Sequence, residues 1–281
     1  MTTVLDIQRF KDEGRRFAVL TAYDFLSARI LDEAGIPILL VGDSLGMVML
    51  GHPTTLPVTL DDMLHHARAV ARGSRQALLV GDLPFMSYQV STEQAIASAG
   101  RFIQEAGMHA VKLEGGGPVI EITRRLAEIG IPVMGHLGLT PQSVHAMGGF
   151  KVQGKTEAQA ARIMSDAKAL EQAGAFSVVL EGMPSKLANT ITQTLRIPTI
   201  GIGAGPGTDG QVLVLHDMLG LTTGKAPKFV KRYANLAEDM ARAATAYSDD
   251  VRTGKFPGPE HEYSANGSAP AKDREEVRYG R

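Results

Sequence analysis

The sequence predicts an α/β protein, a (β/α)8 or TIM barrel, built as a single domain with a short N-terminal helix. Two observations support this prediction. Eight short apolar runs alternate with segments of helical periodicity, and strands buried on both faces read as such continuous runs. Carboxylates end four of these runs, at Asp43, Asp82, Glu114 and Glu181. Because the catalytic groups of α/β barrels come from the C-terminal ends of several strands, this repeated placement is typical of a barrel enzyme.

The elements follow one another in a regular order. A short amphipathic helix is expected from Val4 to about Gly14. The predicted strands are FAVLTAY from Phe17, IPILLVGD from Ile36, QALLVGD from Gln76, HAVKLEGG from His109, IPVMGHLG from Ile131, FSVVLEG from Phe176, IPTIGIGAG from Ile197 and QVLVLHD from Gln211. Helical patterns such as DFLSARILDEAG lie between them, which indicates βαβ units and a parallel sheet. Eight strands favour a closed barrel over an open doubly wound sheet, and QVLVLHD is the weakest of the eight.

Three glycine-containing connections stand out. Two long ones, SLGMVMLGHPTTLPVT after Asp43 and GLTPQSVHAMGGFKVQGKT after His136, are where a barrel builds its active site. The third, GIGAGPGTDG, can either hold a phosphate on its backbone N–H groups or form a tight turn. It does not match the dinucleotide-binding pattern. A tight turn with close backbone approach is therefore the favoured interpretation.

The composition excludes several classes of protein. The 281 residues are 44% hydrophobic and 21% charged, as expected of a globular protein. The net charge is -1 without a marked Lys/Arg block, so nucleic-acid binding is not expected. Cysteine is absent, which excludes disulfides, thiolate metal sites and a cysteine nucleophile. No run reaches the roughly 18 apolar residues that span a bilayer, and no signal-peptide pattern is found, so a cytoplasmic location without membrane attachment is expected.

The chain is expected to divide into two parts. Residues 1–257 form the catalytic barrel domain. Residues 258–281 are polar, rich in Pro, Ser and charge, and lack an apolar period. Such a composition buries too little apolar surface to offset the entropy of ordering, so this tail is expected to be disordered.

Three acids are candidates for a metal site. Asp43, Asp82 and Glu114 end three consecutive strands, and hard cations such as Mg²⁺ prefer carboxylate and water ligands. Alternatively, each acid caps the helix that follows it. The repetition favours the metal site over the caps. No paired-histidine motif at zinc-ligand spacing is present.

Three further residues are candidates for the chemistry. Glu181 ends a later strand and can act as a general base apart from the metal, or else support a metal ligand. Lys112 lies two residues before Glu114, so both should face the barrel interior. Lys112 can neutralise an anionic substrate or enolate, or form a structural ion pair. His136 can donate a hydrogen bond to a substrate oxygen, or be structural.

Several longer stretches resemble the ketopantoate hydroxymethyltransferase family. They are GDSLGMVMLGHPTTLPVT, GDLPFMSY, VKLEGG, GHLGLTPQSV, GGFKVQG and PTIGIGAGPGTDGQVLV. The resemblance runs from about Phe17 to His261, and only the tail departs from it. It implies a barrel of the phosphoenolpyruvate mutase and isocitrate lyase superfamily, assembled as a homodecamer. It also implies Mg²⁺ as cofactor, 5,10-methylenetetrahydrofolate as co-substrate and 3-methyl-2-oxobutanoate as substrate.

The resemblance also implies roles for individual residues. Its metal-site acids match Asp43, Asp82 and Glu114, its substrate contacts match Asp43, Ser44, Asp82 and Lys112, its catalytic base matches Glu181, and a histidine next to the substrate matches His136. The implied reaction moves a hydroxymethyl group from the folate to the keto acid through a Mg²⁺-stabilised enolate. The product, 2-dehydropantoate, leads to pantothenate and coenzyme A.

Two other functions remain as alternatives at this point. One is a Mg²⁺-dependent lyase or mutase of the same superfamily, and those relatives rely on a loop cysteine that this chain lacks. The other, a non-catalytic binding barrel, would be expected to have lost one of the acids, and all four are present.

Overall fold

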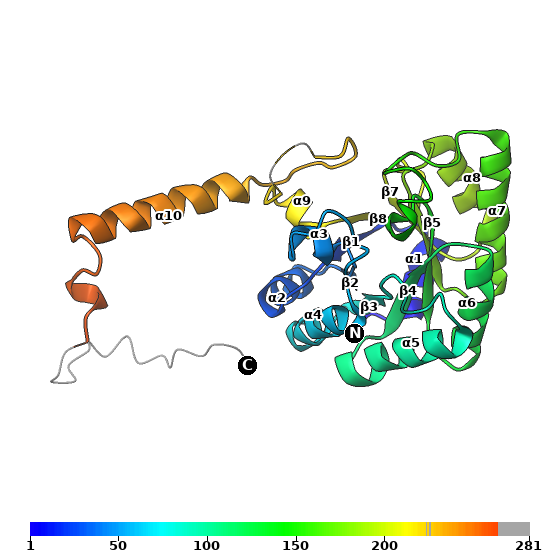
Figure 1. Cartoon of the computed structure of the whole chain (residues 1–281), viewed down its shortest axis with the longest axis horizontal. Coiled ribbons are helices and arrows are strands. Elements are labelled where there is room, and N and C mark those ends of the chain that lie inside the picture. The colour runs from blue at the N-terminus through cyan, green and yellow to red at the C-terminus, as the bar shows by residue number, and fades with distance from the viewer. Residues whose placement is uncertain (223, 225, 264–281) are drawn as a thin grey trace. The chain divides into compact units, whose positions relative to one another are not determined.

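The eight predicted strands form one closed parallel barrel. The structure is a computed structural model that describes residues 1–222, 224 and 226–263. The strands are β1 (Phe17–Thr21), β2 (Ile38–Val41), β3 (Leu78–Asp82), β4 (Ala110–Glu114), β5 (Val133–Gly138), β6 (Ser177–Glu181), β7 (Thr199–Ile202) and β8 (Gly210–Leu213). Each pairs with the next in parallel, and β8 closes on β1 (Figure 1). The fold prediction is therefore confirmed, including its weakest strand.

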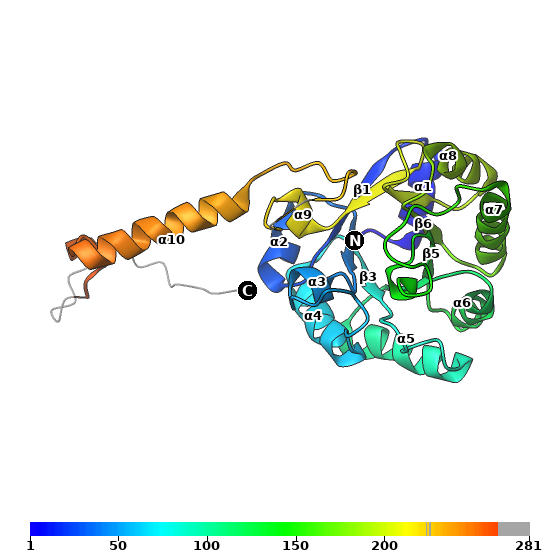
Figure 2. The same cartoon turned by 45° about the horizontal axis from the view of Figure 1, so that its top comes forward.

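The helices surround the barrel, as the tilted view in Figure 2 shows. They are α1 (Val4–Asp12), α2 (Phe25–Glu33), α3 (Leu45–Val48), α4 (Leu60–Gly73), α5 (Thr92–Ala106), α6 (Pro118–Glu128), α7 (Glu157–Gln172), α8 (Ser185–Thr194) and α9 (Leu215–Met218). The expected N-terminal helix is α1, whose Ile7 is fully buried among the interior side chains of the barrel. A short 3₁₀ helix, η1 (Pro141–Ser143), follows β5.

The alternation of side chains along each strand explains why charged groups point into the barrel. On β3, Leu78 and Val80 belong to the interior cluster, and Asp82 is the next residue on that face. On β4, Ala110 lies in the same cluster, so Lys112 and Glu114 continue its inward face. The inner layer is thus apolar at the N-terminal end of the barrel and ionisable at the C-terminal end.

Local chemistry sets the ends of the helices. Thr156 begins α7 by accepting a hydrogen bond from the backbone N–H of Gln159, whose side chain bonds back to the cap. Gly107 ends α5 at φ +69, in the left-handed region that glycine tolerates best. In the GIGAGPGTDG connection, a Cβ added to Gly205 would lie 2.3 Å from Cβ of Ser185. The expected tight turn with close approach is therefore found.

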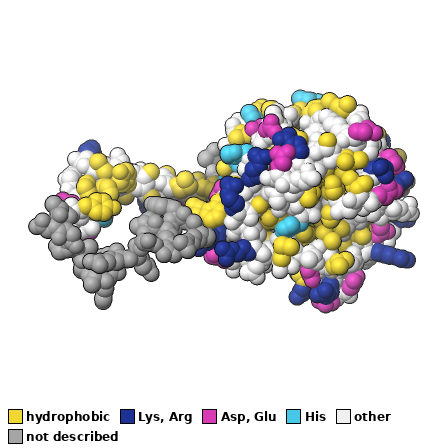
Figure 3. Space-filling view, turned by 90° about the horizontal axis from the view of Figure 1, so that it is seen from below, with side chains coloured by type: hydrophobic (Ala, Val, Ile, Leu, Met, Phe, Trp, Pro, Cys, Tyr) yellow, Lys and Arg dark blue, Asp and Glu magenta, His cyan; other side chains and the backbone are white. Residues whose placement is uncertain are grey.

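The chain divides into two compact units, Met1–Ala234 and Asn235–Arg281. The first is the barrel, and in Figure 3 its Lys, Arg, Asp and Glu side chains are interspersed on the face shown. The second contains α10 (Leu236–Thr253), which buries none of its residues, and a 3₁₀ helix, η2 (Pro259–His261). Most of the predicted tail, 264–281, lies outside the described residues, so its disorder and the boundary at 257 stay predictions. Among the described helices, none combines the length and apolarity that crossing a membrane requires.

Candidate active site

Barrel closure brings the predicted site residues to one mouth. Asp43 follows β2, Asp82 ends β3, Lys112 and Glu114 lie on β4, His136 lies on β5 and Glu181 ends β6. Strand pairing places Asp82 beside Lys112 and Glu114 beside His136. The six side chains therefore lie along five consecutive strands of the barrel rim, β2 to β6, and four of them form two cross-strand pairs.

The first group is an ion cluster centred on Lys112. Its ammonium lies 2.7 Å from both carboxylate oxygens of Asp82 and 3.8 Å from Oε1 of Glu114. The backbone N–H of Asp43 donates to Oδ2 of Asp82 at 3.3 Å. All four residues are buried. Lys112 therefore forms the ion pair that was one of its two expected roles, and this ion pair lies inside the candidate site.

Burial and mutual repulsion shift the protonation of this cluster. Burial, followed by the charges of Asp82 and Glu114, raises the pKa of Asp43 well above its ordinary value. Burial also raises the pKa of Asp82, and the contact with Lys112 offsets this only in part. Although burial alone would lower the pKa of Lys112, the surrounding carboxylates raise it, so Lys112 stays an ammonium at neutral pH.

These acids suit a divalent cation. They are buried oxygen donors whose repulsion an added positive charge would relieve, and Mg²⁺ is usually held by one or two carboxylates plus water and substrate. Within the described residues, no group of three or more His, Asp or Glu side chains is placed so that it could hold a metal by itself. The donor set therefore fits Mg²⁺ held jointly with a substrate, and the three-acid ligand set stays a proposal.

The second group is a histidine held between two carboxylates. Nδ1 of His136 lies 3.3 Å from Oε1 of Glu114, and Nε2 lies 3.1 Å from Oε2 of Glu181. Burial and Lys112 lower the pKa of His136, but the contacts with both glutamates outweigh them and raise the pKa to about 9. Neither contact has hydrogen-bond geometry, so within the described chain both buried nitrogens lack a hydrogen-bond partner. His136 therefore lies in contact with both Glu114 and Glu181.

Glu181 differs from the other acids in its exposure. Its side chain is 16% exposed, compared with 2% for Asp82 and 3% for Glu114. A carboxylate that reaches the open mouth while contacting His136 is placed to meet a substrate.

Two polar residues that the sequence analysis did not select complete the site. Gln142, on η1, is 5% exposed; its Nε2 donates to Oδ2 of Asp43 at 3.0 Å and its backbone N–H to Oε2 of Glu114 at 3.0 Å. The hydroxyl of Tyr88 donates to Oε1 of Gln142 at 2.7 Å. Both lie inside motifs that carried the family resemblance, GHLGLTPQSV and GDLPFMSY. A polar side chain in such a motif, a few residues after a strand that ends in the site, is the signal that could have identified them.

Ser44, implied as a substrate contact, is positioned by a buried tyrosine. The hydroxyl groups of Tyr23 and Ser44 lie 2.8 Å apart. Tyr23 is 1% exposed, and burial raises its pKa, so it stays a neutral hydroxyl. Ser44 is therefore held next to Asp43 at the mouth.

A family model described as ketopantoate hydroxymethyltransferase matches residues 1–259. The chain belongs to this family. It is 60% identical over 257 residues to the 3-methyl-2-oxobutanoate hydroxymethyltransferase of Syntrophus aciditrophicus (strain SB), covering 92% of this chain and 94% of that protein. It is 58% identical to the enzyme of the same name from Syntrophotalea carbinolica, covering 93% of this chain and 98% of that protein.

More distant solved structures share the fold. Phosphonopyruvate hydrolase in complex with oxalate and Mg²⁺ has a TM-score of 0.59 at 14% identity, covering 95% of this chain and 93% of that one. 2,3-Dimethylmalate lyase, a member of the PEP mutase/isocitrate lyase superfamily, has a TM-score of 0.57 at 19% identity, covering 95% and 93%. Ketopantoate hydroxymethyltransferase membership confirms the resemblance and the predicted transferase, and supports neither the lyase or mutase nor the binding barrel.

Proposed function

We propose that this ketopantoate hydroxymethyltransferase family member transfers a hydroxymethyl group from 5,10-methylenetetrahydrofolate to 3-methyl-2-oxobutanoate with Mg²⁺, giving 2-dehydropantoate. The observation that carries the proposal is the bridge from Glu114 through His136 to Glu181, next to the buried acids around Lys112. This bridge places acids that can bind a cation next to a carboxylate that can act as a base. Removal of a proton next to a ketone requires both, a base for the proton and a positive charge near the keto oxygen.

The acids and their neighbours would bind the keto acid. Asp43, Asp82 and Glu114 would hold Mg²⁺, which when bound supplies positive charge against the negative charge that develops on the keto oxygen. Lys112, kept protonated by the surrounding carboxylates, is suited to contact the carboxylate or keto oxygen of the substrate. Ser44, held by Tyr23, would donate a further hydrogen bond.

Glu181 would remove the proton from C3. Its partly exposed carboxylate reaches the mouth, and its contact with His136 restrains its orientation. Because the two glutamates raise the pKa of His136 to about 9, the imidazole carries positive charge at neutral pH. Both of its N–H groups can then donate, to the neighbouring glutamates or to a substrate oxygen that enters the mouth. The proton passes from C3 to Glu181. Water adds to the methylene carbon of the folate and both C–N bonds of that carbon break, so tetrahydrofolate leaves with the two hydrogens of the water and the carbon becomes a formaldehyde carbonyl. The electron pair left at C3 forms the new bond to this carbon, and its oxygen takes the proton back from Glu181 to become the new hydroxyl.

Exchange of the C3 proton tests this function without the folate. Wild-type protein in heavy water is expected to exchange the C3 proton of 3-methyl-2-oxobutanoate in the presence of Mg²⁺ but not after chelation, as followed by NMR. Glu181→Gln, close in size to the glutamate, should slow exchange by about a hundred- to ten-thousandfold. Glu33→Gln is the matched control, since Glu33 is exposed at the end of α2. Exchange at the wild-type rate in Glu181→Gln would assign the base to another group.

The proposal extends to assembly and location. A homodecamer is expected from the family resemblance, and Met240, Tyr247 and Val251 on α10 are exposed apolar side chains of the kind buried between subunits. Light scattering should give about ten times the chain mass of 30.0 kDa. A monomer at micromolar concentration would contradict it. A cytoplasmic location is proposed on the same grounds and would be checked by cell fractionation.

A further inference from the structure

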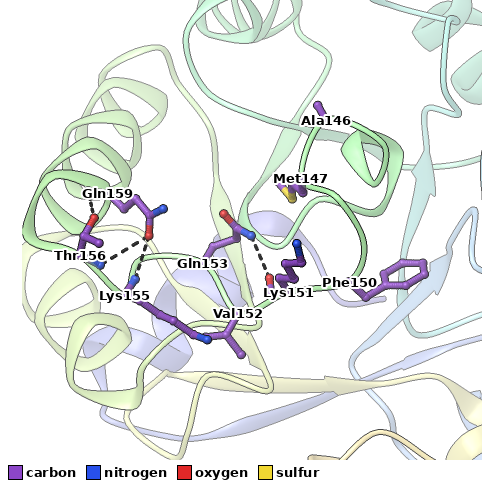
Figure 4. Close-up of a pocket in the computed structure, with 9 residues that line it drawn as sticks. All are labelled: Ala146, Met147, Phe150, Lys151, Val152, Gln153, Lys155, Thr156 and Gln159. Atoms are coloured by element: carbon purple, nitrogen blue, oxygen red, sulfur yellow. Dashed lines mark hydrogen bonds between the residues drawn. The ribbon is translucent and has the colours of Figure 1, made fainter.

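A pocket lies on the long connection between β5 and α7, apart from the residues assigned above. Its volume is about 740 Å³, within the range of small-molecule sites. It is lined by Ala146, Met147, Phe150, Lys151, Val152, Gln153, Lys155, Thr156 and Gln159. In Figure 4, Thr156 and Gln159 lie on one side at the start of α7, Lys151 and Gln153 lie centrally, and Phe150 lies on the far side.

The residues that line the pocket favour an anionic ligand that also has an apolar part. It contains two lysines and no acidic residue. Lys151 and Lys155 are both exposed, so their ammonium groups are available to a ligand. Phe150 and Val152, 51% and 46% exposed, add an apolar surface that can pack against an aromatic ring. A ligand with carboxylates joined to an aromatic group matches this combination.

The same connection is hydrogen-bonded to the candidate site near its start and to the residue after Glu181 farther along. Near its start, Gln142 contacts Asp43 and Glu114. Farther along, the backbone N–H of Gln153 donates to the carbonyl of Gly182 at 2.9 Å, one residue after Glu181. A pocket residue is therefore hydrogen-bonded to the neighbour of the proposed base. The segment that carries the pocket therefore lies directly beside the segment that carries the proposed base.

We propose that this pocket binds the p-aminobenzoylglutamate tail of the folate co-substrate, with Lys151 and Lys155 as partners of its glutamyl carboxylates. This inference rests on the proposed function. The keto acid needs its single carboxylate at the buried acids and Lys112, whereas folate carries its glutamyl carboxylates at the end remote from the reacting methylene group. The ligand class and the position of the pocket are thus consistent with each other.

Binding of tetrahydrofolate triglutamate, measured by calorimetry, tests the assignment. The double variant Lys151→Met/Lys155→Met should bind it at least about tenfold more weakly than wild type, because it loses two charge-assisted contacts. A tetrahydropterin that lacks the tail should bind both proteins equally. Lys168→Met, an exposed change on α7 outside the pocket, is the matched control and should bind triglutamate like wild type.

Three results would overturn the pocket assignment. They are equal triglutamate affinity in the double variant and wild type, equal weakening for the tailless pterin, and absence of folate binding to a wild-type protein that exchanges the C3 proton. Failure of the proposed function can be distinguished from failure of the pocket assignment, because in that case the wild-type protein would not exchange the C3 proton. The double variant should exchange this proton at the wild-type rate, since that step involves no folate.

Discussion

Replacing Gln142 by leucine is expected to destabilise the protein and weaken its metal-dependent binding of the keto acid. Leucine is similar in volume but has no polar atoms. It would remove the donor to Oδ2 of Asp43 at 3.0 Å, the donor to the carbonyl of Leu83 at 2.9 Å, and the acceptor of Tyr88 at 2.7 Å. The backbone N–H of residue 142 would still donate its hydrogen bond to Oε2 of Glu114.

The size of the effect follows from these contacts. A hydrogen bond to a charged group contributes about 1.5–3 kcal/mol and a neutral one about 1 kcal/mol. Tyr88 can turn its hydroxyl to the carbonyl of Glu114 at 3.2 Å, so its loss is partly compensated. The expected loss in the free energy of unfolding is about 3–4 kcal/mol. Since the Gln142 bond also opposes the raised pKa of Asp43, its removal should raise that pKa further and weaken Mg²⁺ binding.

Urea unfolding and calorimetry would measure the two effects. Stability is taken from the unfolding midpoint and slope, and binding from titration of 3-methyl-2-oxobutanoate in the presence of Mg²⁺. Gln104→Leu, at an exposed position of α5, should change stability by less than about 0.5 kcal/mol. A loss below about 1 kcal/mol in Gln142→Leu, or unchanged Mg²⁺-dependent affinity, would refute the role given to Gln142.

Three further outcomes are expected. Asp43→Ala and Asp82→Ala should each abolish Mg²⁺-dependent binding of the keto acid in calorimetry, and unchanged affinity would contradict the ligand assignment. Burial raises the pKa of Asp32, but hydrogen bonds from the Ser74 hydroxyl and three backbone N–H groups outweigh it and hold the pKa below its ordinary value. The ionised carboxylate therefore stabilises the fold above its unfolded-state pKa near 4, and this contribution is lost as pH falls through the lower folded-state pKa. Asp32→Asn should cost about 1–2 kcal/mol at pH 7 and progressively less toward pH 3 in urea unfolding, and a cost independent of pH would argue against it. A chain ending at Pro257 should keep its stability and assembly by unfolding and light scattering, and dissociation would show that the tail is needed.

The sequence alone determined the barrel and the position of its acids. Eight apolar runs separated by helical patterns are a local signal, and a residue that ends such a run is at the barrel mouth wherever the strand lies in the sheet. Asp82, Lys112 and Glu114 could be placed on the inward face because the period of a strand is two residues. No contact between distant residues was needed for these predictions.

Only the tertiary structure decided which of these groups touch. From the sequence alone, Glu181 is expected to lie apart from the other acids, whereas in the structure His136 lies in contact with both Glu181 and Glu114. That contact depends on the register that pairs Glu114 with His136 and Gly138 with Glu181. Gln142 lies 99 positions from Asp43 along the chain and meets it only because the loop after β5 folds back over the mouth. Strand register and the path of the loop after β5 are set by packing and hydrogen bonding between distant segments. They cannot be predicted from a local pattern of residue types.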